Sequence, residues 1–145
     1  MQIYTIGFTK KTAEQFFGKL KKNGIRRLLD IRLKPASQLA GFAKAGDLRY
    51  FLRELCDIEY VRVPLLAPTE ETMVAYRGKQ IDAQTFEHQF TALLRERGVD
   101  KALDRSLFNA PVVLLCSEPT AEHCHRRLVA EYLREHWGNV EIVHL

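Results

Sequence analysis

Long apolar runs are absent from this sequence of 145 residues. No stretch approaches the about 20 apolar residues that cross a membrane, and the opening residues lack the basic start and apolar core of a secretory signal. We therefore expect a cytoplasmic protein with no membrane partner. Internal repeats and low-complexity segments are missing as well, and the composition fits neither a disordered nor a fibrous protein.

Cysteine is also scarce. The three cysteines, Cys56, Cys116 and Cys124, are an odd number in a chain without a secretory signal. Because disulfides are uncommon in reducing compartments, we expect reduced thiols. A chain of this length buries enough apolar surface to fold without a disulfide or a structural metal.

The composition that remains is typical of one globular domain spanning residues 1–145. Hydrophobic residues make up 46% of the chain and charged residues 28%, the balance of a folded protein. The net charge of +4 is uneven, because residues 1–53 hold 12 Lys and Arg against 3 Asp and Glu, whereas residues 54–145 hold 10 against 15. A basic half favours an anionic partner such as phosphate, a nucleotide or nucleic acid, although a solvated charged face explains it equally well.

Strand and helix signals alternate along the chain. Short β-branched and apolar runs predict strands at residues 3–6, 25–31, 58–63, 111–116 and 140–144. Helical periods, capping residues and glycine stops predict helices at residues 12–23, 48–55, 70–76, 82–98 and about 121–136. This order predicts an α/β fold, a single three-layer, Rossmann-like domain whose mainly parallel sheet of about five strands carries helices on both faces.

Parallel sheets of this kind bind ligands beyond the carboxyl ends of their strands. The rule selects residues 7–10, 30–41, 64–69 and 117–127 as places to search. The segment at residues 115–127, LCSEPTAEHCHRR, is the densest in chemical groups, with two thiols, two imidazoles and two guanidiniums.

Helical geometry gives these side chains different directions. At about 100° per residue, His125 faces the buried side of the predicted helix, His123 faces solvent and Cys124 lies at the edge. Because the directions diverge and the spacing matches no usual zinc pattern, we expect no metal at Cys116, Cys124 and His125. No cofactor is expected either.

Two chemical interpretations of this segment stand beside a structural one. A cysteine, Cys116 or Cys124, is a thiolate nucleophile activated by Arg126, with His125 as its base. Alternatively, the helix start and Arg126 hold a phosphate or carboxylate, and Glu118 is a general base. In the structural interpretation the cysteines only pack, Glu118 interacts with the helix dipole and His125 is a core residue.

A second group of residues leaves the predicted second strand. Asp30 and Arg32 are two residues apart on an extended segment, so they share one face. In a functional interpretation both side chains meet the first cluster across the edge of the sheet. In a structural interpretation they only pair with each other. Together with Arg126 and with Gly7, at the end of the first strand, they form the predicted anion-binding set.

Basic and aromatic residues also interleave at Phe42, Lys44, Arg49, Tyr50 and Arg53. Such a pattern is typical of grooves that bind single-stranded nucleic acid. The helix period of this segment explains part of it. Nucleic acid is therefore the alternative to a small anionic ligand as the partner.

Three motifs resemble the uncharacterised family called domain of unknown function 488. They are TIG at residues 5–7, DIR at residues 30–32 with Pro35, and LLCSE at residues 114–118 leading to CHR at residues 124–126. The resemblance covers essentially the whole chain and implies one α/β domain whose motif residues share a site. This chain departs from the family pattern at Phe8, where His is common, and at residues 65–68, LLAP, where Leu-Gly-Gly is common.

The family has no established reaction, so the resemblance supports the site more than the function. Our leading hypothesis is a small enzyme that acts on an anionic substrate, with Arg32 and Arg126 binding the anion and Glu118 and His125 transferring protons. Cys116 is the reserve nucleophile. The alternative is a non-catalytic module that binds nucleic acid or senses a ligand.

Overall fold

A five-stranded sheet forms the centre of the computed structural model, which describes residues 1–37, 41–118 and 124–145. The strands are β1 (Gln2–Gly7), β2 (Arg27–Asp30), β3 (Glu59–Arg62), β4 (Val112–Cys116) and β5 (Glu141–His144), in the order β3-β2-β4-β1-β5. Every neighbouring pair is parallel. The predicted α/β class with a parallel sheet is confirmed.

The helices begin and end largely where the sequence signals lie. They are α1 (Ala13–Lys22), α2 (Ala45–Phe51), α3 (Glu70–Arg77), α4 (Ala83–Glu96), α5 (Val99–Ala102) and α6 (His125–Trp137). A π-helical turn, Leu52–Cys56, extends α2, and short 3-10 turns occupy Pro35–Ser37, Gly41–Ala43, Pro64–Leu66 and Arg105–Phe108. Within the described ranges, none of the helices combines the length and apolar character that crossing a membrane requires.

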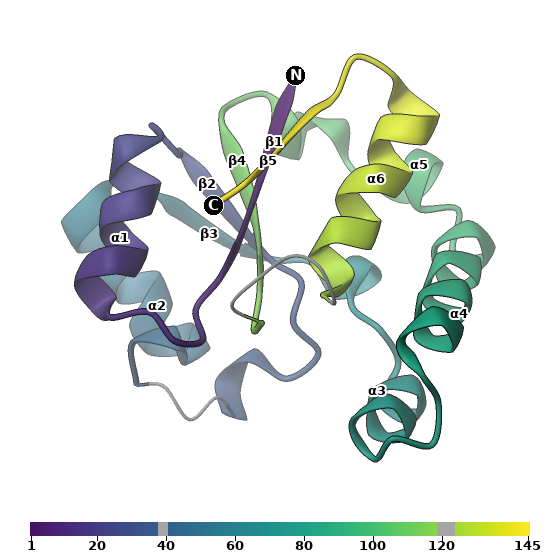
Figure 1. Ribbon diagram of the computed structural model, residues 1–145. Helices are drawn as coiled ribbons and strands as arrows, with labels where there is room; N and C mark the ends of the chain where they lie inside the picture. The colour runs from purple at the N-terminus through teal and green to yellow at the C-terminus, as the bar shows by residue number, and fades with distance from the viewer. Residues whose placement is uncertain (38–40, 119–123) are drawn as a thin grey trace.

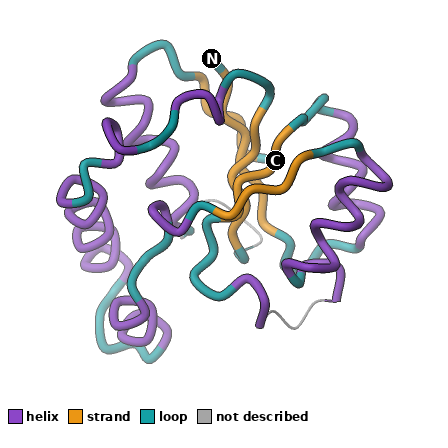
Figure 2. Tube along the Cα trace, turned by 180° about the vertical axis from the view of Figure 1, so that it is seen from behind, coloured by secondary structure: helices purple, strands orange, loops and turns teal. Residues whose placement is uncertain are grey.

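Helices cover both faces of the sheet, and the strands lie between the two helical layers (Figures 1 and 2). On one face, α1 and α2 contribute Phe16, Leu20 and Leu48 to a core cluster. On the other, α4 and α6 contribute Phe90 and Leu133. Because both faces are buried, the central strand β4 is apolar throughout.

The central position of β4 determines where a ligand site is expected. This strand lies between β1 and β2, which are followed by α1 and α2 on one face, whereas β4 is followed by α6 on the other. Adjacent strands whose connections leave toward opposite faces open a crevice at their carboxyl ends. The residues after β2 and β4 meet at this edge.

The start of α6 differs from the expectation. The helix begins at His125 instead of near residue 121, and Cys124 precedes it in an extended conformation, with φ −112° and ψ 143°. Residues 119–123 lie outside the described residues.

Candidate functional site

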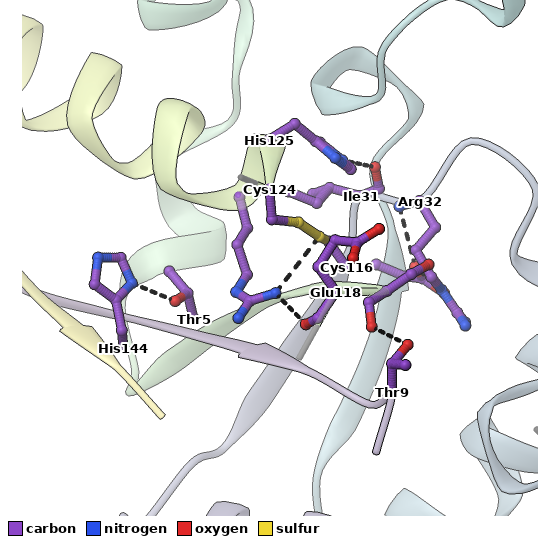
Figure 3. The surroundings of a disulfide bond; sticks show 12 residues. Thr5, Thr9, Ile31, Arg32, Cys116, Glu118, Cys124, His125 and His144 are labelled. Carbon is purple, nitrogen blue, oxygen red and sulfur yellow. Dashed lines mark hydrogen bonds and ion pairs between the residues drawn. A yellow bond between two sulfur atoms is a disulfide. The ribbon is translucent and has the colours of Figure 1, made fainter. Parts of the chain in front are cut away.

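Cys116 and Cys124 form a disulfide at the centre of the site (Figure 3). Cys116 is the last residue of β4 and Cys124 is the N-cap residue of α6. The disulfide therefore joins the end of the strand directly to the start of the helix that follows it. The expectation of reduced thiols is therefore wrong for this pair. An odd number of cysteines is compatible with one bridge, and Cys56 is the free cysteine.

His125 is buried beside the disulfide and faces the sheet, as its place on the helix predicts. Its Nε2 donates to the Ile31 carbonyl at 2.8 Å, because a carbonyl can only accept. Burial chiefly, together with the positive charges of Arg126 and Arg77, lowers the pKa of His125 from 6.5 to about 4, although the hydrogen bond to Ile31 acts in the opposite direction. At neutral pH the imidazole is therefore neutral and Nδ1 carries the lone pair.

The side chains of Cys116, Cys124 and His125 converge. Their ligand atoms all lie within 4.8 Å of one another, and all three residues are buried. The expectation that their directions diverge is wrong for these three, because Cys124 has extended rather than helical dihedral angles and the helical angle count does not apply to it. His123, the fourth residue of that prediction, lies outside the described residues.

Arg126 is fully buried beneath the turn after β4. Its Nη1 donates to the Glu118 carbonyl at 2.7 Å and contacts the Cys116 sulfur at 3.6 Å. Among the residues that the structure describes, its Nε and Nη2 have no hydrogen-bond partner. Burial lowers the pKa of Arg126 from 12.5 to about 10, so the guanidinium keeps its charge at neutral pH.

Gly7 makes the close packing of this turn possible. A Cβ at this position would lie 1.6 Å from the Glu118 carbonyl oxygen and 2.7 Å from Arg126 Nη1. Only a residue without a side chain lets the turn after β4 lie directly against the end of β1. The predicted anion-binding role of Gly7 stays a prediction, but close approach of the backbone explains the glycine.

Asp30 and Arg32 form a buried ion pair with two hydrogen bonds. Arg32 Nε and Nη2 donate to the two Asp30 carboxylate oxygens at 2.8 and 2.7 Å, and the Tyr60 hydroxyl donates to Asp30 at 2.5 Å. The Asp30 carboxylate is thus neutralised within the protein. Arg32 Nη1 is buried without a partner in the described part of the chain.

A cavity of about 240 Å³ opens beside the disulfide on the α3 side. Its charged and reactive lining is Arg32, Lys34, Glu70, Arg77, Cys116, Glu118, Cys124 and His125. The cavity brings together the residues predicted after β2 and β4, with two exceptions: Asp30 and Arg126 are buried and are not among its lining residues. Lys34 Nζ, at its rim, is 2.7 Å from a Glu70 carboxylate oxygen.

Arg77 is a lining residue that the sequence did not single out. It is the last residue of α3 and is exposed. Its position in the sequence, among the mainly acidic residues 54–145, gives no signal, because only the packing of α3 against α4 brings it to the cavity. It adds a second guanidinium beside Arg32.

The two departures from the family pattern have structural roles. Phe8 packs under Arg32, whose guanidinium carbon lies 5.3 Å from the ring centroid. In the segment at residues 65–68, the Leu65 and Ala67 carbonyls accept from Arg97 Nη1 at 2.8 and 2.6 Å. Neither segment supplies a titratable side chain.

The basic and aromatic segment is only partly exposed. Phe42 and Phe51 pack against Phe17, with ring centroids 5.9 and 6.0 Å away. Tyr50 is 54% exposed, and the guanidinium of Arg53 lies 5.7 Å from its ring centroid. Nucleic-acid binding by this segment stays a prediction. Of its aromatic side chains, Tyr50 is the exposed one that a base could stack on.

Comparison with known proteins gives one match. A family model described as "Domain of unknown function DUF488" matches residues 12–133. No curated protein and no solved structure matches the chain. The matched range includes the ends of β2 and β4 and the start of α6, and therefore the cavity-lining residues.

Proposed function

Because the chain belongs to the DUF488 family, whose description names no reaction, we propose a function from the site alone: a small enzyme that acts on an anionic, phosphate-bearing substrate. The observation that carries the proposal is the cavity lining, which includes the cationic Arg32, Lys34 and Arg77 as well as Glu118 and His125. Cationic and titratable groups that converge in one cavity are the usual signature of an active site.

The anion-binding part rests on the two guanidiniums. Arg32 is held rigidly by Asp30, and its Nη1 is buried with no hydrogen-bond partner among the described residues. An unpaired buried N–H group gains the most from an incoming acceptor. Arg77 faces the same cavity from α3, so a phosphate between them receives charge-assisted hydrogen bonds from two sides.

The chemical part rests mainly on Glu118. Glu118 lines the cavity and is exposed, so its carboxylate can exchange protons with a bound substrate and with solvent. His125 is a weak base at neutral pH because burial lowers its pKa to about 4, and it therefore contributes a neutral acceptor rather than a cation. Cys116 is a nucleophile only when the disulfide is reduced.

The test begins with binding of inorganic phosphate and a nucleoside monophosphate, measured by calorimetry, and continues with turnover of phosphate monoesters and diesters. We expect Arg77→Gln to raise the Kd about tenfold, equivalent to about 1.4 kcal/mol. Glu118→Gln should lower kcat by about 10²–10⁴. Arg95→Gln, an exposed arginine of α4 outside the cavity lining, is the matched control.

Absence of binding and turnover with every one of these ligands would refute the proposal, as would an equal effect of Arg95→Gln. The nucleic-acid alternative predicts a different pattern. Affinity for a single-stranded oligonucleotide would fall steeply with salt, and Arg53→Gln would weaken it while Arg77→Gln would not.

A further inference from the structure

We propose that Cys116, Cys124 and His125, once the disulfide is reduced, bind one zinc ion whose fourth coordination position opens into the cavity. The proposal goes beyond the function proposed above and does not depend on it. Its basis is the convergence of three buried ligand atoms within 4.8 Å, at the point where β4 ends and α6 begins. Two thiolates and one imidazole are a donor set that zinc uses when one position remains for water or substrate.

The spacing of the two cysteines suits one shared ion. Zinc–sulfur bonds of about 2.3 Å place two sulfurs of a tetrahedral site about 3.8 Å apart. The Cα atoms of Cys116 and Cys124 are 7.2 Å apart, which leaves reduced side chains room to separate to this distance. The cysteines sit on a central strand and at a helix start, so the backbone that carries them is held by the fold.

The surroundings of His125 prepare it as a ligand. Nε2 donates to the Ile31 carbonyl at 2.8 Å, which fixes the tautomer and leaves the Nδ1 lone pair for the ion. Metal-bound histidines usually have such a hydrogen bond on the second nitrogen. The T-shaped contact with Phe90, at a centroid distance of 5.4 Å, fixes the ring orientation.

Arg126 supports one of the two sulfur ligands. Its Nη1 lies 3.6 Å from the Cys116 sulfur, so the guanidinium stabilises a thiolate at that position. Two thiolates neutralise the charge of a zinc ion, so occupancy of the site leaves no buried net charge besides that of Arg126. No described carboxylate competes with the three ligands in the cluster.

The open position follows from the cavity. Cys116, Cys124 and His125 all line it, together with the cationic Arg32 and Arg77. A fourth ligand therefore enters from the side where an anion is attracted. A zinc ion in this place also adds positive charge to the lining.

The experiment uses the full chain in its two redox states. A water-soluble phosphine opens the disulfide: water supplies the two thiol protons and the oxygen that the phosphine takes up as its oxide. The reduced protein is then titrated with zinc against a chromophoric chelator, and zinc binding releases the two thiol protons. We expect one equivalent of zinc in the reduced protein and none in the disulfide form.

Variants identify the ligands. Cys116→Ser and Cys124→Ser should each weaken zinc binding by more than about 100-fold, because even loss of a residue that only supports a ligand costs 10–100-fold. His125→Asn should weaken it to a similar extent. Cys56→Ser, which removes the free cysteine, should leave the affinity unchanged.

A second measurement does not depend on the folding of variants. Cobalt added to the reduced wild-type protein should produce the absorption bands of thiolate ligation and of tetrahedral coordination. Zinc should also protect two cysteines from alkylation, with Cys56 alone modified. Absence of a zinc equivalent, a cobalt spectrum without thiolate bands, alkylation of all three cysteines or binding of copper(I) in place of zinc would each overturn the proposal. None of these measurements involves an anionic substrate, so they are independent of the enzyme hypothesis.

Discussion

At the residue scale, Gly7 shows how closely the turn after β4 lies against the end of β1. The alanine Cβ at this position would lie 1.6 Å from the Glu118 carbonyl oxygen, and a backbone atom cannot rotate away as a side chain can. We expect Gly7→Ala to lower the free energy of unfolding by about 3 kcal/mol. Urea denaturation followed by circular dichroism measures the change.

Gly18→Ala is the matched control. Gly18 lies within α1 and a Cβ there meets nothing within 4 Å. Alanine is favoured over glycine inside a helix by about 1 kcal/mol, so this variant should be more stable than the wild type. Equal stability of the two variants would show that the turn does not press against β1.

The burial of His125 makes stability depend on pH. In the folded, disulfide-bonded protein its pKa is lowered from 6.5 to about 4, whereas the unfolded chain has the ordinary value. The unfolded state therefore binds a proton first as the pH falls, so the contribution of His125 is complete above about pH 6.5 and is lost between about pH 6.5 and 4. The expected loss is about 3 kcal/mol, since each pKa unit corresponds to about 1.36 kcal/mol.

Comparison with His125→Gln isolates this contribution, because carboxylates titrate in both proteins. The glutamine amide keeps a donor for the Ile31 carbonyl but has no titration near neutral pH. In metal-free buffer, the wild type should lose more stability than the variant between pH 6.5 and 4. Parallel pH profiles would mean that His125 is protonated at little cost in the folded protein.

The same residues show where prediction from sequence succeeded and where it failed. His125 belongs to α6, and its helical position correctly predicted that it faces the sheet. Cys124 is one residue earlier and outside the helix, so the same reasoning gave it the wrong direction. A helix boundary misplaced by a few residues was enough to conceal the convergence of three ligand atoms.

At the element scale, local signals predicted the helices and strands well. The capping box of α1 forms as expected, with hydrogen bonds of 2.9 and 3.1 Å between Thr12 and Gln15. The cap of α4 is also present, because the Asp82 carboxylate accepts from the Thr85 amide at 2.8 Å. These interactions span three residues, and a sequence pattern is sufficient to predict them.

The strand order was beyond such reasoning. β2 pairs with β4, which follows it by about 80 residues in sequence, and the register aligns Arg27 with Val112. Side-chain alternation predicts which face is buried but carries no information on the neighbouring strand. The cavity depends on this pairing, because it brings Arg32 beside Cys116.

At the scale of the whole molecule, the uneven charge along the sequence did not locate the site. Arg32 and Lys34 come from the basic residues 1–53, but Arg77 comes from the mainly acidic remainder. Folding combines the three in one cavity. Several other basic residues, among them Lys19, Lys21 and Arg53, are exposed on α1 and the α2 side, where solvation is sufficient to explain them.

The two core clusters should unfold as one unit. β4 belongs to both, since Leu114 contributes to the cluster under α6 and Leu115 to the cluster under α1, so neither face can separate without exposing the other. Trp137, the one tryptophan of the sequence, packs on the α6 side, and its fluorescence reports that side alone. Far-ultraviolet circular dichroism reports the whole chain.

Leu20→Ala on the α1 side and Leu133→Ala on the α6 side each remove a fully buried side chain and should cost about 3 kcal/mol. Because the sheet is shared, Leu20→Ala should lower the midpoint of the Trp137 fluorescence transition as much as the midpoint measured by circular dichroism. Leu133→Ala should also shift both midpoints together. If Leu20→Ala shifted only the circular dichroism transition, the two faces would unfold separately, and the shared sheet would not couple them.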